Sequence, residues 1–294
     1  MAESERALNE NASNPHRWEQ SDEIYFCLTS IYNHAPWVRR MWILVEEEGP
    51  DLSDLPQALR EKIHIARHAE VFAGHTDVLP TFNSLAIESV MWRIDGLAER
   101  FLYFNDDVFL TSPLEPEDVF VGNRPVLRGE WVDYSALLDD EIARADPALF
   151  AQFMHINGAA LCGYDAARLF ACAHVVHPLR RSVMAKLFEQ HKAAFLANIS
   201  HRFRDLSQFL PQGAHTHMSI LRGDFVQGSK DDHQHITSGQ GMGQPPAQTR
   251  DLLMPEGLDG VRFLCVNDLP QLEVLVLDAR ELIAQAVGGM PAPL

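Results

Sequence analysis

The segment FLYFNDDVFL, at residues 101–110, limits what this chain can fold into more than any other stretch. Its first four residues are apolar or aromatic, and Asn105, Asp106 and Asp107 follow them at once. Such a short apolar run is typical of a buried strand. Two adjacent carboxylates at the end of a core strand repel each other and lose hydration, and both effects cost free energy. The pattern therefore raises the question of what compensates these charges.

A second apolar run ends in the same way. In FLCVND, at residues 263–268, Asn267 and Asp268 follow an apolar strand. If the two strands are neighbours in one sheet, Asp106 or Asp107 converges with Asp268, and such carboxylates repel unless a positive group lies between them. A hard divalent cation with oxygen ligands, Mg²⁺ or Mn²⁺, meets this need. The alternative is that these acids are turn residues and helix caps.

Short apolar runs alternate with amphipathic segments along the chain. The patterns predict strands at 41–45, 63–66, 101–104 and 261–266, helices at 21–35, 81–94 and 181–199, and a strand or helix followed by a helix over 274–287. This alternation predicts an α/β fold with a mostly parallel central sheet flanked by helices. Ligands of such sheets bind outside the carboxyl ends of the strands, where the Asn-Asp pairs fall.

The polar segments at 1–20 and 228–250 suggest the domain organisation. We expect residues 1–20 to form an N-terminal arm and residues 21–294 to form a single catalytic α/β domain with helical insertions. Residues 228–250 are polar and rich in glycine and proline, which predicts a mobile loop.

Charge and hydropathy exclude several classes of protein. The formal net charge is -17, which is unfavourable for nucleic acid or an anionic membrane surface. No stretch approaches the roughly 20 apolar residues that span a bilayer, and the first residues carry no secretory signal. The four cysteines form no CxxC pair, so we interpret them as reduced thiols of a cytoplasmic protein. An anionic substrate therefore needs a local binding device.

Three further segments carry candidate site residues. AHVVHP contains His174 and His177, SHRFRD contains His201 and Arg204, and LPTFNSLAIE contains Asn83, Ser84 and Glu88. A histidine can act as a general base toward a sugar hydroxyl, and an arginine can bind phosphate through two hydrogen bonds. Judged from the local sequence alone, a helix-capping histidine and a surface arginine are the commoner roles, and a simple N-cap fits the third segment at least as well.

Two histidine pairs have the spacing i, i+2. His215 and His217 form one pair, and His233 and His235 form the other. Either pair can bind a metal ion in principle. Because the second pair lies in the predicted loop, we expect it to be exposed to solvent.

Long motifs in the chain resemble those of the Stealth family of sugar-1-phosphate transferases, which includes bacterial capsular polysaccharide phosphotransferases. APWVRRMWIL and LPTFNSLAIESVMWRIDGLAERFLYFNDDVFL are similar to the second motif block of that family. AHVVHPLRRSVMAKLFEQHKAAFLANISHRFRD resembles the third block, and VRFLCVND resembles the fourth. The resemblance implies a GT-A- or Rossmann-like domain that transfers sugar-1-phosphate from a nucleotide-sugar such as a UDP-hexosamine to a saccharide acceptor in capsular or cell-wall polysaccharide synthesis.

The resemblance also implies a role for each candidate residue. His174 matches the base and Arg204 the phosphate-facing arginine. Asp106, Asp107, Asn267 and Asp268 would hold Mg²⁺ or Mn²⁺. The residues expected to bind substrate are Asn83, Ser84, Glu88, Asn105, His177 and His201.

Two features depart from the family pattern. The usual first block, a strand such as D-VYTWVDGSD, does not precede residue 23, so we expect either a start upstream of the printed one or the loss of that strand. Tyr25 and Thr29 stand where family members often have arginine. Two other functions therefore remain open: a metal-dependent glycosyltransferase that releases nucleoside diphosphate, and a non-catalytic family member.

Overall fold

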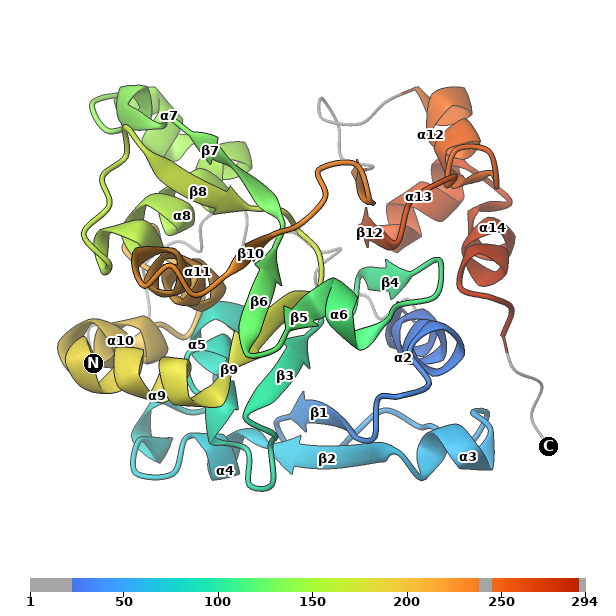
Figure 1. Cartoon of the computed structure of the whole chain (residues 1–294), viewed down its shortest axis with the longest axis horizontal. Coiled ribbons are helices and arrows are strands. Elements are labelled where there is room, and N and C mark those ends of the chain that lie inside the picture. The colour runs from blue at the N-terminus through green and yellow to red at the C-terminus, as the bar shows by residue number, and fades with distance from the viewer. Residues whose placement is uncertain (1–22, 238–244, 291–294) are drawn as a thin grey trace.

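The computed structural model describes residues 23–237 and 245–290, so the expected arm at 1–20 lies outside the described residues. Within these ranges the chain is a mixed α/β structure whose strands form five small sheets (Figure 1). Three strand pairs are parallel and four are antiparallel. The α/β class is confirmed, whereas one mostly parallel, GT-A- or Rossmann-like central sheet is not.

The first part of the described chain follows the sequence prediction closely. Helix α2 (Glu23–His34) ends before Pro36, whose ring cannot continue a helix. Strands β1 (Met41–Val45) and β2 (Ile63–Arg67) form a parallel pair along one side of the molecule (Figure 1). Short helices α3 (Gln57–Arg60) and α4 (His68–Val71) flank β2.

The predicted helix at 81–94 is wrong in extent. The structure has α5 (Ser84–Glu88) and a 3₁₀ turn (Met91–Arg93), because Val90 leaves helical geometry at φ -126°, ψ -5°. The buried Asn198 amide donates to Ser89 Oγ at 2.8 Å, at the point where the helix stops. A tertiary contact thus overrides the local apolar pattern.

The predicted helix at 181–199 is also divided. It consists of α9 (Arg181–Gln190) and α10 (Lys192–Ser200), and His191 between them has φ -119°, ψ 37°. Figure 1 shows both helices on the same side of the molecule as α8 (Phe150–Ala160) and α11 (Pro211–Leu221).

Strands from distant parts of the chain meet in the centre. Strand β3 (Arg100–Tyr103) pairs antiparallel with β9 (His177–Arg180). Strand β4 (Val108–Leu110) pairs antiparallel with β12 (Phe263–Asn267), which pairs in parallel with β11 (His233–Thr237). The two apolar strands that precede the Asn-Asp pairs are therefore not neighbours in one sheet, because β4 and not β3 lies beside β12.

Five further strands and five further α-helices belong to the rest of the described chain. The sheets are completed by β5 (Phe120–Val121), β6 (Arg124–Leu127), β7 (Gly129–Val132), β8 (Leu169–Cys172) and β10 (Val226–Gln227). The other helices are α6 (Pro116–Val119), α7 (Glu141–Ala145), α12 (Pro246–Leu253), α13 (Leu269–Leu275) and α14 (Ala279–Ala286). None of the helices in the described ranges is long and apolar enough to cross a membrane.

The prediction of a loop at 228–250 is wrong for its described part, because β11 lies inside it and α12 begins at Pro246. The cause is a buried ion pair beside the strand. Arg128 binds both carboxylate oxygens of Asp232, with an Nη2–Oδ2 distance of 2.7 Å, and its guanidinium lies 4.4 Å from the ring centre of Phe263. Specific pairing of one polar residue, Asp232, thus orders part of a segment whose other described polar side chains are largely exposed.

The largest apolar cluster lies directly under the strand ends that carry the acidic residues. Helix α2, strands β4 and β12 and helices α13 and α14 contribute its buried side chains. Ser30 of α2 accepts a hydrogen bond from the Leu110 backbone N–H at 3.0 Å, which fixes α2 against β4. The acidic residues therefore stand on a rigid support.

Candidate active site

Strand pairing brings the two acidic tips together. The Val266 N–H donates to the Asp107 carbonyl at 2.9 Å, and Val108 lies opposite Cys265 in the β4–β12 register. Continuing this antiparallel register places Asp106 opposite Asn267. The prediction that the segments after Phe104 and Val266 meet is confirmed for the backbone, through antiparallel pairing.

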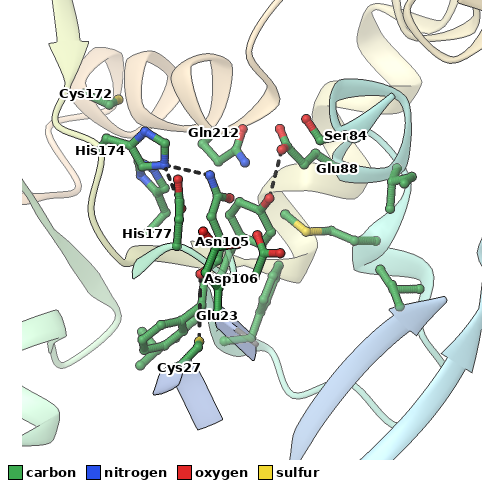
Figure 2. Close-up of a pocket in the computed structure, with 18 of the residues that line it drawn as sticks. Glu23, Cys27, Ser84, Glu88, Asn105, Asp106, Cys172, His174, His177 and Gln212 are labelled. Atoms are coloured by element: carbon green, nitrogen blue, oxygen red, sulfur yellow. Dashed lines mark hydrogen bonds and ion pairs between the residues drawn. The ribbon is translucent and has the colours of Figure 1, made fainter. Parts of the chain in front are cut away.

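The same logic places His174 beside Asn105. Because β3 and β9 are antiparallel and Tyr103 lies opposite His177, residues that precede β9 fall beside residues that follow β3. The Asn105 amide nitrogen lies 2.7 Å from His174 Nε2, and Asp107 Oδ1 lies 3.4 Å from the same nitrogen. Figure 2 shows the Asn105–His174 contact.

His174 faces a carboxylate that stabilises its charged form. Burial lowers the pKa of His174, but its hydrogen bond and charge interaction with Asp107 together raise it above the ordinary value. In the neutral ring, Nε2 accepts the Asn105 N–H. In the imidazolium, Nε2 becomes a donor, and a turned Asn105 amide can present Oδ1, which has no hydrogen-bond partner among the described residues. The surroundings therefore accommodate both protonation states.

The floor of the site is strongly negative. Burial, and next the charge of Asp107, raise the pKa of Asp106. Burial and the charge of Asp107 also raise the pKa of the Cys265 thiol well above its ordinary value. Asp268 has a left-handed backbone at φ 63°, which non-glycine residues rarely adopt and which clusters at functional sites. This arrangement favours the approach of a cation.

Helix α5 supplies the opposite wall. Ser84 Oγ accepts a hydrogen bond from Arg204 Nη2 at 2.8 Å. Glu88 is 5% exposed, and its Oε1 accepts the Tyr103 hydroxyl at 2.8 Å. Its Oε2 is buried and has no hydrogen-bond partner in the described part of the chain. Figure 2 shows Ser84 and Glu88 side by side, across the cleft from His174.

Asn83 and His201 lie outside the lining of the cleft. Asn83 is fully buried: its Oδ1 caps α5 by accepting the Leu85 N–H, and its amide donates to the His201 carbonyl and to Gln208. His201 Nε2 lies 3.3 Å from Ser207 Oγ. These contacts hold α5 against the loop that carries Arg204. In the structure, Asn83 and His201 therefore support the fold around the cleft and do not line it.

The other predicted residues line one continuous cleft. They are Ser84, Glu88, Asn105, Asp106, Asp107, His174, His177, Arg204, Asn267 and Asp268. Burial lowers the pKa of His177 to about 3, so this histidine is neutral at physiological pH. The sequence motifs thus identify groups that the fold gathers from five separate segments.

Strand β11 contributes His233 and His235, which the sequence analysis named as a possible metal-binding pair but expected to be exposed, and Thr237, which it did not name. His233, His235 and Thr237 alternate along the strand and all line the cleft. The rings of His235 and His174 lie 5.4 Å apart. The expectation of exposure holds for His235, yet the side chain faces the site. The i, i+2 spacing would have shown this if the segment had been interpreted as a strand.

Two sets of side chains come into question for a metal ion. In residues 23–237 and 245–290, the histidine, cysteine, aspartate and glutamate groups whose ligand atoms lie within 4.8 Å of one another are His174, His235 and Cys265. Two imidazoles and a thiol suit an ion such as Zn²⁺, whereas Mg²⁺ prefers oxygen donors. No aspartate belongs to that group, but Asp107 Oδ1, a buried carboxylate oxygen 3.4 Å from His174 Nε2, is the kind of donor that a hard cation prefers.

His215 and His217, the other predicted pair, face away from each other on α11. Each forms a hydrogen bond to the backbone of a neighbouring strand. His215 Nε2 accepts the Arg180 N–H of β9, and His217 Nε2 accepts the Phe170 N–H of β8, each at 3.0 Å. Both residues are fully buried. Their role in the structure is therefore to join α11 to two strands.

Comparison with known proteins places the chain in a family. The model of Stealth protein conserved region 2 matches residues 17–126. An exopolysaccharide phosphotransferase of Nocardia farcinica is 30% identical over 294 residues, which cover 94% of this chain and 53% of that protein. An exopolysaccharide phosphotransferase of Streptomyces coelicolor is 29% identical, with 92% of this chain and 43% of that protein covered.

A receptor polysaccharide phosphotransferase of Streptococcus oralis is 30% identical over 60% of this chain and 59% of its own length. The chain spans about two fifths to three fifths of the length of these three curated relatives. The second motif block deduced from the sequence coincides with the matched region. The chain therefore belongs to the Stealth protein family and carries its conserved region 2.

Proposed function

We propose that this chain transfers sugar-1-phosphate from a nucleotide-sugar to a sugar hydroxyl, with a divalent cation as cofactor, in the synthesis of an extracellular polysaccharide. The observation that carries the proposal is the contact of His174 with Asn105 and Asp107, opposite the Arg204–Ser84 pair in one cleft. The names of the relatives, which are polysaccharide phosphotransferases, support the reaction class.

His174 is placed to remove the acceptor proton. When the Asn105 amide turns away from the neutral ring, the freed lone pair of Nε2 takes the proton of the acceptor hydroxyl, and the Asp107 carboxylate 3.4 Å away stabilises the imidazolium that results. The acceptor oxygen then forms a bond to the phosphorus next to the donor sugar. The bond from that phosphorus to the nucleoside monophosphate breaks, and the monophosphate leaves with the electron pair.

Arg204 is placed to neutralise phosphate charge. Its hydrogen bond to Ser84 Oγ fixes the guanidinium at the start of α5, and the buried network around Asn83 fixes the segment that carries it. Phosphoryl transfer depends mainly on such positioning and charge stabilisation.

The acidic residues would hold the cation. Asp107 and Asp268, with Asp106 and Asn267 beside them, supply the oxygen donors that Mg²⁺ or Mn²⁺ prefers. A bound divalent cation would neutralise the diphosphate of the donor. Removal of the cation by chelation is expected to abolish donor binding, and replacement of Asp107 by asparagine is expected to have the same effect.

A product assay tests the proposal. The 294-residue protein is incubated with UDP-N-acetylglucosamine, Mg²⁺ and a mixture of free sugars, and the released nucleotide is identified by chromatography. We expect uridine monophosphate. Release of uridine diphosphate would assign the glycosyltransferase reaction instead, and release of neither nucleotide, together with no donor binding, would favour a non-catalytic protein.

A further inference from the structure

The lining of the cleft includes three polar side chains to which neither the motifs nor the relatives assign a role. Gln152 and His155 of α8 and Gln212 of α11 line the cleft. Gln212 is 1% exposed. The side-chain atoms Gln152 Oε1, His155 Nδ1 and Gln212 Oε1 are buried and have no hydrogen-bond partner among the described residues. A buried polar atom that lacks a hydrogen-bond partner costs free energy, so each such group needs an explanation.

These side chains form one wall. The Leu210 N–H donates to the Met154 carbonyl at 3.1 Å, which locks the start of α11 against α8. A Cβ atom at Gly213 would lie 3.8 Å from His155 Nδ1, so His155 lies against the first turn of α11 next to Gln212. Figure 2 shows Gln212 between His174 and Glu88. The wall therefore borders the groups to which we assign the chemistry.

The wall is electrically neutral. Burial, followed by the charges of His217 and His174, lowers the pKa of His155 to about 4, so its ring is uncharged at neutral pH. The two glutamine amides carry no charge at any pH. Glu88, at the edge of the wall, adds an acceptor through its unpartnered Oε2.

The missing partners of this wall are mainly hydrogen-bond donors. An ionised phosphate has only acceptor oxygens, whereas a sugar ring carries hydroxyl groups that donate and accept. The first turn of α11 and Arg204 both favour an anion nearby. The donor sugar carries such an anion, its phosphate, whereas a neutral sugar substrate that receives the phosphate group has none. From this geometry we propose that Gln212 and His155, with Gln152 and Glu88, bind the hydroxyl or acetamido groups of the donor sugar.

The proposal rests on the proposed function and names the sugar subsite of the same cleft. Gln212 has three rotatable side-chain bonds, so a small rotation brings its amide to an entering hydroxyl. Occupation by the sugar pairs the buried acceptors and recovers the free energy that they cost in the free protein. A site built to hydrogen-bond a hydroxyl in this way also rejects ligands that lack it.

Calorimetry with two probes tests the subsite. Binding of UDP and of UDP-N-acetylglucosamine is measured in Mg²⁺ for the unmodified protein and for Gln212→Leu, Gln212→Asn and His155→Phe. We expect the affinity for the sugar nucleotide to fall by about 5–30-fold in each variant, equivalent to the loss of one or two hydrogen bonds. The affinity for UDP is expected to change less than twofold. Gln190→Leu, an exposed glutamine of α9 outside the cleft, is the matched control.

The outcomes separate the two proposals. If every variant weakens UDP and the sugar nucleotide equally, or weakens neither, the sugar subsite is wrong while the proposed function stands. If the unmodified protein binds neither probe and releases no uridine nucleotide, the proposed function fails and the subsite with it. A rise in the KM for the sugar acceptor with unchanged donor affinity would assign the wall to the acceptor and overturn the proposal. Gln212→Asn retains the amide and guards against a folding defect of the leucine variant.

Discussion

His174 of the cleft and the two histidines of α11 differ in what their ring nitrogens contact. His215 and His217 are fully buried, and each accepts a backbone N–H from a neighbouring strand. His174 has a side chain that is 34% exposed, and it faces the Asp107 carboxylate. Burial lowers the pKa of the first two, whereas Asp107 raises that of the third. A histidine paired with backbone is thus a structural link, and one that faces a carboxylate in a cleft is available for proton transfer.

The largest expected effect is on catalysis at His174. Replacement of His174 by alanine is expected to lower kcat by roughly 10² to 10⁴ because the general base is lost. Donor affinity and the midpoint of thermal unfolding are expected to change little, since no buried backbone group loses its partner. Release of uridine monophosphate over time gives kcat, and calorimetry gives the donor affinity.

His201→Ala sharpens this first test. The family resemblance assigns His201 to substrate binding, but the structure places it outside the cleft. We expect this variant to retain donor affinity and kcat. Loss of donor affinity in His201→Ala would favour the resemblance over the geometry, and full activity in His174→Ala would remove His174 from the mechanism.

The second largest expected effect is on the free energy of unfolding, at the Arg128–Asp232 pair. Like His215 and His217, this pair connects parts of the fold. The Arg128 side chain is 3% exposed, and although burial opposes ionisation of Asp232, hydrogen bonds with His233 and Arg128 lower its pKa to about 2. Arg128→Ala leaves a largely buried carboxylate with only His233 beside it, so we expect the free energy of unfolding to fall by about 3 kcal/mol. Urea unfolding measures this change.

A double variant provides the control for that prediction. Arg128→Met combined with Asp232→Leu removes both charges and is expected to lose less stability than Arg128→Ala alone. If the double variant is the less stable of the two, the pair contributes net stability, and the expectation is contradicted.

The sequence patterns predicted those parts of the molecule where local and tertiary preferences agree. Strands at 41–45 and 101–104 and the helix that ends before Pro36 are close to the observed elements because apolar runs and proline act locally. The meeting of the two acidic tips was also predictable. The route by which they meet was not, because β4, which follows the first tip, and not β3, which precedes it, pairs with β12.

Other features depend on contacts that no local pattern contains. Asn83 appears as a site residue in the motif, yet its amide is used to hold the His201 carbonyl and Gln208. His235 lies in a segment of loop-like composition that becomes a strand because Arg128 binds Asp232. The antiparallel partner of β12 is equally set by chain topology and not by alternation of strands and helices.

A smaller effect on stability is expected at His215. His215→Leu removes the acceptor of the buried Arg180 N–H, and we expect the free energy of unfolding to fall by about 1–3 kcal/mol. His215→Gln retains a side-chain acceptor of similar reach and is expected to lose less. Urea unfolding of both variants makes the comparison. Equal losses would show that packing, and not the hydrogen bond to β9, determines the role of His215.

The smallest expected effect is on the pH dependence of stability. Burial, followed by the charges of Arg180 and His177, lowers the pKa of His215 to about 3, from an ordinary value of 6.5. The unfolded chain therefore takes up a proton that the native state does not, so the stabilisation is complete above pH 6.5 and is lost as the pH falls toward 3. His215→Gln removes this proton uptake. Between pH 7 and pH 6 we expect its free energy of unfolding to decrease by about 0.7 kcal/mol less than that of the unmodified protein. Urea unfolding at the two pH values measures the difference. If the stabilities of His215→Gln and of the unmodified protein change equally with pH, His215 titrates alike in the native and unfolded states, and its assignment as a buried structural link is wrong.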